Sequence, residues 1–130
     1  MNVLISIKPK HFAKIARGEK RLDLRKTLPT QNLPFEKPFT VYLYVSGTGE
    51  VRGEFLCDGF IVSDPNDVVA ALACVSRAEL MQYCSRGGRI NGWGIGRTRI
   101  YKHAKRLSDF GLVRPPQSWQ YTRRVPERDD

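Results

Sequence analysis

The amino-acid sequence predicts an α+β fold, in which a mixed β-barrel is flanked by two or three short helices. A long β-rich stretch with internal glycines, at residues 50–62, indicates a sheet that curls. Short segments with helical spacing or capping residues, at residues 10–17, 68–73 and 76–86, supply the helices. The chain has 130 residues, enough for one domain with a core, and we assign residues 1–122 to it.

A strand and a short basic helix are expected at the N-terminus. Residues 3–7 are apolar and rich in β-branched side chains, which is typical of a strand. Pro9 ends this run, because proline cannot donate to a sheet ladder but suits the first turn of a helix. Residues 10–17 place apolar side chains among lysines at roughly helical spacing, and Gly18 supplies the left-handed residue that often ends a helix.

Residues 21–25 alternate charged and leucine side chains, which predicts a second strand. Successive side chains of a strand point to opposite faces. The two leucines are therefore expected to face the core, while Arg21, Asp23 and Arg25 share the other face.

A loop broken by prolines, at residues 26–38, separates this strand from two further strands at residues 40–46 and 50–62. Gly53 and Gly59 lie inside the longer of these strands. Glycine in a strand interior often marks a bulge or a bend, so these positions predict the curvature of a barrel.

Two helices are expected next. Residues 68–73 form the first of them. Ser76 and Glu79 then have the spacing of a capping box, in which each side chain satisfies a free amide of the other residue. The helix that they begin is expected to run to about Arg86.

The C-terminal third begins with a glycine-rich run at residues 87–96, expected to be mostly loop, and an outgoing strand at residues 95–105. An extended, proline-anchored segment follows, and we expect its Trp119 and Tyr121 to cover the barrel. Residues 123–130 are expected to form a flexible C-terminal tail.

The charge of the chain indicates a polyanionic partner. Its 22 Lys and Arg residues against 13 Asp and Glu residues give a net charge of +9 and a pI near 9.8. No apolar run approaches the ~20 residues of a membrane-spanning helix, so a membrane is not expected. RNA is the expected partner and DNA the alternative, and a soluble basic surface or a protein-interaction module with incidental charge stays open. No oligomeric state is predicted.

Cys57, Cys74 and Cys84 lack the paired spacing of a zinc site, so we expect reduced thiols and no metal or cofactor. The N-terminal run has no cleavage site of a secretory signal, which predicts a cytoplasmic location. His11 and His103 lie far apart with no Ser or Cys constellation around them, which argues against a hydrolytic triad.

Residues 8–26 carry eight basic side chains against two acidic ones, on a helix end and the strand after it. Within them, residues 18–25 read GEKRLDLR, which resembles the Gly-x-Lys-x-x-Glu-x-Arg motif of the ASCH family, a branch of the PUA-like superfamily. Asp23 stands where the motif has Glu. The order of strands and helices and the closing RPPQSWQY segment at residues 114–121 are also similar.

The resemblance implies a PUA-like mixed barrel with a cleft beside the first helix, where the motif Lys and Arg face RNA or a nucleotide. Lys20 and Arg25 are the leading candidates for binding, supported by Lys8 and Arg21. An Arg offers a planar fork to phosphate or to a base edge, and a Lys offers a mobile point charge. The alternative is that Asp23 and Arg25 form only an ion pair on a strand.

Some relatives suggest an enzyme, either a ribonuclease or an amidohydrolase that acts on a modified nucleoside through a Lys, a Thr and a Glu. Lys20 matches that Lys, Asp23 replaces the Thr, and Ala73 stands roughly where the Glu is expected. Lys20 and Asp23 are therefore candidate catalytic residues only as a general acid-base pair.

The glycine-rich run at residues 87–96 has the wrong spacing for a dinucleotide fingerprint. Trp93 between its glycines is predicted either to stack on a base or to pack in the core. In the first case, Arg89 and Arg97 are expected to contact phosphates beside it.

Overall fold

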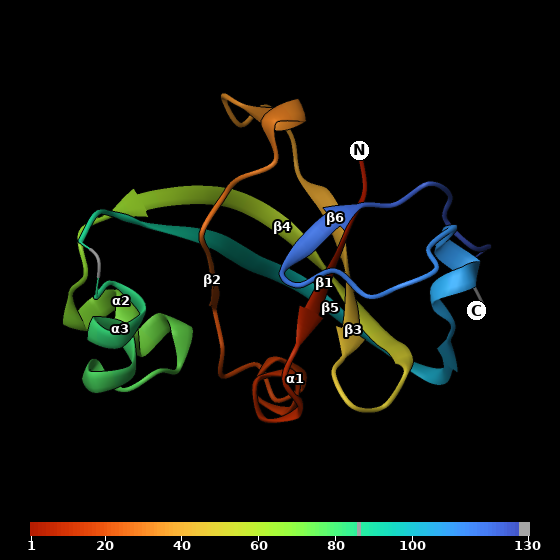
Figure 1. Cartoon of the computed structure of the whole chain (residues 1–130), viewed down its shortest axis with the longest axis horizontal. Helices are drawn as coiled ribbons and strands as arrows, with labels where there is room; N and C mark the ends of the chain where they lie inside the picture. The colour runs from red at the N-terminus through yellow and green to blue at the C-terminus, as the bar shows by residue number, and fades with distance from the viewer. Residues whose placement is uncertain (86, 128–130) are drawn as a thin grey trace.

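The computed structural model describes residues 1–85 and 87–127, which form one six-stranded mixed sheet with three short helices (Figure 1). The neighbouring strands are, in order, β2 (Leu22–Arg25), β5 (Ile90–Lys105), β4 (Glu50–Ser63), β3 (Phe39–Val45), β1 (Val3–Ile7) and β6 (Trp119–Tyr121). Among these strands, β1 and β3 are the parallel pair and the other neighbours are antiparallel. The sheet curls into a half-barrel, which confirms the predicted fold class.

The helices are α1 (Pro9–Ala16), α2 (Asp67–Ala73) and α3 (Arg77–Tyr83). The predicted capping box of α3 is present: Ser76 Oγ accepts from Glu79 N at 3.0 Å, and Glu79 Oε1 accepts from Ser76 N at 3.1 Å. The helix ends at Tyr83, before its predicted end at Arg86, a position outside the described residues. Gly87 and Gly88 follow with φ of 78° and 92°, which no helix allows.

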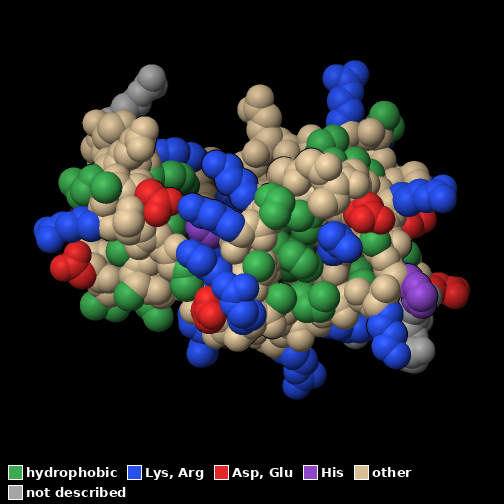
Figure 2. All heavy atoms as spheres, turned by 90° about the horizontal axis from the view of Figure 1, so that it is seen from below, with side chains coloured by type: hydrophobic (Ala, Val, Ile, Leu, Met, Phe, Trp, Pro, Cys, Tyr) green, Lys and Arg blue, Asp and Glu red, His purple; other side chains and the backbone are tan. Residues whose placement is uncertain are grey.

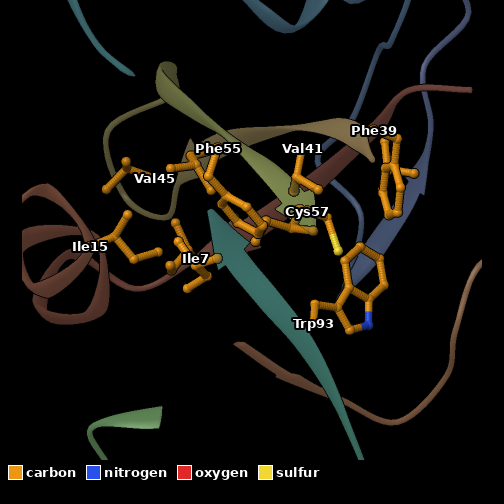
Figure 3. Packing of buried hydrophobic residues seen from close by; sticks show 12 residues of the cluster. Ile7, Ile15, Phe39, Val41, Val45, Phe55, Cys57 and Trp93 are labelled. Carbon is orange, nitrogen blue, oxygen red and sulfur yellow. The ribbon is translucent and has the colours of Figure 1, made fainter. Parts of the chain in front are cut away.

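The main core lies on the concave side of the half-barrel. Its buried side chains come from β1, β3, β4 and β5, with Ile15 of α1 closing one end (Figure 3). Figure 3 shows Ile15 beside Ile7, while Phe39 and Trp93 lie at the other end of the cluster. A second cluster joins Leu22 of β2 to buried residues of α2 and α3, so the helix pair is packed against β2.

The glycine-rich run corrects one prediction, because β5 begins at Ile90 and takes in most of a segment expected to be a loop. Gly92 and Gly96 make this strand possible. A Cβ on Gly92 would lie 2.8 Å from a methyl group of Leu22, and one on Gly96 would lie 2.9 Å from the carbonyl oxygen of Leu56. The glycines thus provide close contact between strands rather than loop freedom. The register of β4 against β5 and β3 shifts beside Gly53, and that against β5 also shifts before Phe60, as predicted for a curled sheet.

The two ends of the sheet, β2 and β6, are joined by side chains instead of a backbone ladder. Arg25 Nη1 of β2 donates to the carbonyl oxygen of Ser118 at 3.1 Å. Trp119 Nε1 of β6 donates to Thr27 Oγ1 at 2.8 Å, and the Trp119 ring lies edge-on to Trp93 with centroids 5.6 Å apart. The closing segment therefore covers the open side of the half-barrel and fixes Ser118 beside β2.

Two short 3₁₀ helices complete the fold: η1 (Thr30–Asn32) before β3 and η2 (Leu107–Phe110) after β5. Among the described helices, none is long and apolar enough to cross a membrane. The flexible tail assigned to residues 123–130 stays a prediction, and its last three residues lie outside the described part of the chain.

Candidate functional site

A cleft of about 380 Å³ lies where α1, β2 and α3 meet the ends of β1 and β3. The closing segment forms one wall through Gln117. Ten polar side chains line the cleft: Ser6, Lys8, His11, Lys20, Asp23, Arg25, Ser46, Glu79, Tyr83 and Gln117. A volume of this size lies within the range of pockets that bind small molecules.

Lys20 reaches the cleft through the turn at the end of α1. Gly18 adopts φ of 74°, and the amides of Gly18 and Glu19 close the turn on Ile15 and Lys14 carbonyl oxygens. The Lys20 side chain is buried, with 4% of the residue exposed, and its Nζ donates to the carbonyl oxygen of Ala73 at the end of α2. Burial lowers the pKa of Lys20, and the nearby Asp23 charge opposes this change.

Asp23 and Arg25 form a buried, two-pronged ion pair. They lie two residues apart on β2, so both side chains point to the same face. Arg25 Nε and Nη2 donate to the two carboxylate oxygens of Asp23, the second at 3.2 Å, and only 5% of the Asp23 side chain and 11% of the Arg25 side chain are exposed. Arg25 also binds Ser118, so the pair holds the closing segment against the cleft.

Two polar atoms in the cleft wall have no partner in the protein. His11 Nδ1 and the Tyr83 hydroxyl are the buried side-chain nitrogen and oxygen atoms, among the described residues, that lack a hydrogen bond. Both residues line the cleft. Leaving a buried polar atom without a partner costs about 1–3 kcal/mol, so their convergence on one cavity indicates a place for a ligand.

Both of these groups are uncharged near neutral pH. Burial, followed by the charges of Lys20, Lys10 and Lys14, lowers the pKa of His11 to about 4, with Asp23 opposing. Burial also raises the pKa of Tyr83 to about 12. The inner wall therefore presents neutral hydrogen-bonding groups beside an ion pair whose charges offset each other.

The lowered pKa of His11 predicts a pH-dependent stability. The unfolded chain takes up a proton at His11 near pH 6.5, and the folded chain does so only near pH 4. The stabilisation is therefore complete above pH 6.5 and is lost as the pH falls toward 4. Because the ring is only partly buried, we expect His11→Leu to remove about 1–2 kcal/mol of the stability difference between about pH 7.5 and pH 5, measured by urea unfolding. His103→Leu, at an exposed position on β5, should retain the wild-type difference, and an unchanged profile in His11→Leu would refute the assignment.

Exposed lysines surround the mouth of the cleft. Lys8 lines its edge, Lys10 Nζ lies 3.7 Å from Glu79 Oε2, and Lys26 Nζ lies 3.8 Å from the centre of the Tyr83 ring. Figure 2 shows Lys and Arg side chains gathered on the face that carries α1. The arrangement is a neutral interior with a cationic mouth.

The structure brings four of the residues predicted for the site into the cleft: Lys8, Lys20, Asp23 and Arg25. The remaining four lie outside its lining. Arg21 is exposed at the start of β2, Arg89 lies 3.8 Å from Asp64, and Arg97 lines a separate groove beside Glu54 and Arg99.

Trp93 requires a correction. No part of it is exposed, it belongs to the main core, and its Nε1 donates to the carbonyl oxygen of Thr27 at 3.3 Å. Its flanking glycines admit neighbouring strands instead of a base, so base stacking on Trp93 is wrong and core packing is right.

The sequence analysis missed His11, Glu79 and Tyr83. Glu79 and Tyr83 lie four residues apart on α3 and so share a helix face, which the spacing could have indicated. Nothing in the local sequence places that face over β2. Among the described residues, no cluster of three His, Cys, Asp or Glu side chains could hold a metal ion.

Comparison with solved structures identifies the fold. The crystal structure of ASCH from Zymomonas mobilis matches with a TM-score of 0.79 and 17% identity, over 94% of this chain and 87% of that chain. A serine-to-alanine and a tyrosine-to-phenylalanine mutant of the Zymomonas mobilis protein match with TM-scores of 0.79, identities of 17% and 16%, and 94% of this chain against 88% and 90% of those chains. Scans of family models and of curated proteins find no match. The chain therefore has an ASCH, PUA-like fold, which confirms the resemblance at the level of the fold.

Proposed function

We propose that this protein binds single-stranded RNA and holds one unpaired nucleotide in the cleft beside α1, with the base inside and the phosphates at the mouth. The observation that carries this proposal is the pair of buried atoms without a partner, His11 Nδ1 and the Tyr83 hydroxyl, in one cavity. A base edge offers neutral donors and acceptors to match them. In a duplex that edge is already paired, so the proposal requires an unpaired nucleotide.

The interior favours a base over a phosphate. Arg25 directs its donors to Asp23 and Ser118, and Lys20 donates to Ala73. A phosphate inside would meet two carboxylates, Asp23 and Glu79, without an uncommitted guanidinium to offset them. A neutral heterocycle avoids this cost, and the remaining hydrogens of the Lys20 ammonium can donate to its carbonyl oxygen.

The lysines at the mouth are placed for the backbone of the same nucleotide. Lys8, Lys10 and Lys26 are all exposed, so their charges can neutralise phosphates without prior desolvation. The same charges would attract RNA over longer distances and speed its association.

The proposed partner is RNA, with DNA as the alternative, and the proposed location is the cytoplasm. Three free cysteines, Cys57, Cys74 and Cys84, suit a reducing compartment. The ribose 2′-hydroxyl is the group by which a protein distinguishes the two nucleic acids. Binding to DNA and RNA strands of equal length and sequence would decide between them.

Salt-dependent binding tests the proposal. In fluorescence anisotropy with a labelled RNA strand, log K should fall linearly with log salt, and the matching duplex should bind at least about tenfold more weakly. Replacing Lys8 and Lys10 by Gln should make the slope shallower by about 1.4, because each phosphate contact on a single strand contributes about 0.7. Lys37→Gln, a charge loss in the loop before β3, should leave the slope nearly unchanged. A response to salt that is flat for wild type would refute binding through phosphates and favour a protein-interaction module.

Hydrolysis of RNA or of a modified nucleoside in the same cleft is the second candidate, favoured by the burial of Lys20 beside Asp23. It ranks second because both Asp23 oxygens are bound by Arg25, and Lys20 Nζ is bound to Ala73. Incubation with labelled RNA and with modified nucleosides should leave both intact if the protein only binds. Turnover that disappears in Lys20→Met would reverse this order.

A further inference from the structure

A second cationic region lies outside the cleft, in the last third of the chain. Residues 97–124 contain eight basic side chains and a single acidic one, Asp109. By contrast, residues 27–96 contain five basic and seven acidic side chains. The net charge of the chain is thus divided between two separate segments, the one that forms the cleft and this one.

The structure gathers much of this segment around Tyr101 and η2. Arg99 and Lys105 lie over the Tyr101 ring, at 5.7 Å and 5.3 Å from its centre. Arg123 and Arg124 donate their amides to the carbonyl oxygen of Phe110 at 3.0 Å and 3.3 Å. The C-terminal arginines are therefore fixed against η2. We call the set Arg99, Lys102, Lys105, Arg106, Arg123 and Arg124 the distal basic surface.

Three members of this surface have uncompensated charges. Lys102, Arg106 and Arg123 are exposed, and among residues 1–85 and 87–127 no carboxylate lies within ion-pair distance of them. Asp109, the acidic residue of the segment, accepts from the amide of Arg106 at 2.9 Å in the cap of η2. Like charges held close together repel one another, which an anionic partner would relieve.

The distal basic surface is connected to the cleft. The chain runs from η2 through exposed Arg114 to Gln117, which lines the cleft, and to Ser118, which Arg25 holds. Figure 1 shows this connection as the blue segment between η2 and β6. Figure 2 shows further Lys and Arg side chains toward the same end of the molecule. A polyanion that leaves the cleft along this wall would meet positive charge on its way.

We propose that the distal basic surface is a second RNA-binding site, which holds phosphates of the strand whose unpaired base occupies the cleft. This inference rests on the proposed function of the cleft. It adds that the bound RNA extends beyond the cleft and that affinity increases with length, whereas the cleft alone would give no such increase. The surface has no pocket for a base, so it contributes affinity without sequence preference.

RNA length separates the two sites. Fluorescence anisotropy would compare strands of about 4 and about 16 nucleotides on wild type and on a variant with Lys102→Gln, Arg106→Gln and Arg123→Gln. We expect the variant to bind the short strand as wild type does. Its affinity for the long strand at about 0.1 M salt should fall on the order of 100-fold, with a slope shallower by about 2.

The control variant removes three equally exposed charges elsewhere, with Lys37→Gln, Arg77→Gln and Arg89→Gln, and should lose much less affinity for the long strand. Equal losses in the two variants, or a long strand that binds the distal variant as it binds wild type, would overturn the second site. If wild type fails to bind the short strand while the distal variant still loses the long one, the proposed cleft function fails and the distal surface stands.

Discussion

Arg25→Met is expected to lower the free energy of unfolding by about 3–5 kcal/mol, the largest loss of stability among the changes considered. The substitution keeps much of the apolar stem but leaves the Asp23 carboxylate buried without a partner. It also removes the hydrogen bonds by which Arg25 holds Ser118. Adding Asp23→Asn should recover more than half of the loss, because the uncompensated charge is then gone. Urea unfolding of the two single variants and the double variant gives the coupling between the residues.

Arg17→Gln is the matched control for this prediction. Arg17 and Glu19 have the same sequence spacing and a similar two-pronged contact, but 57% and 51% of their side chains are exposed. An exposed pair contributes at most about 1 kcal/mol. If Arg25→Met costs no more than Arg17→Gln, the buried pair does not hold the cleft wall.

Replacing Tyr83 by Phe and His11 by Leu together is expected to reduce affinity for single-stranded RNA by about 10- to 100-fold at neutral pH without loss of stability. Each change removes a polar atom that has no partner in the protein alone. The free energy of unfolding should therefore stay constant or increase, while two hydrogen bonds to the base are lost. Anisotropy titrations and urea unfolding on the same preparations measure both quantities.

Tyr121→Phe should show the opposite pattern. The Tyr121 hydroxyl accepts from the amide of Gln31 at 3.2 Å, so its removal leaves a protein donor without a partner. We expect a small loss of stability, about 0.5–1.5 kcal/mol, and unchanged RNA affinity. A Tyr83 and His11 variant that loses stability but keeps its affinity would show that these groups serve the fold and not a ligand.

Much of the fold follows from local patterns in the sequence. The apolar run before Pro9 predicted β1 and the start of α1, and the Ser76 and Glu79 spacing predicted the cap of α3. Alternation along residues 21–25 also placed Asp23 and Arg25 on one face, where the structure pairs them. These features depend on neighbours in the chain, and sequence spacing is sufficient to read them.

The remaining features depend on contacts between distant segments. Tyr83 and Glu79 enter the cleft only because α3 packs beside β2 through Leu80 and Leu22, a contact with no local signature. The glycines around Trp93 have the composition of a loop. Their role in the strand becomes clear only from the side chains and carbonyl groups that press against them.

Amide chemical shifts during titration with an RNA strand of about 4 nucleotides test the central claim most directly, because they locate the bound nucleotide on the protein. The account predicts the largest changes at Lys8 and His11 in and beside α1, at Lys20 to Arg25, and at Glu79 and Tyr83 of α3. Residues of η1 and the loop before β3 should change little. Shifts confined to the distal basic surface, or no shifts at a concentration that saturates anisotropy, would contradict binding in the cleft.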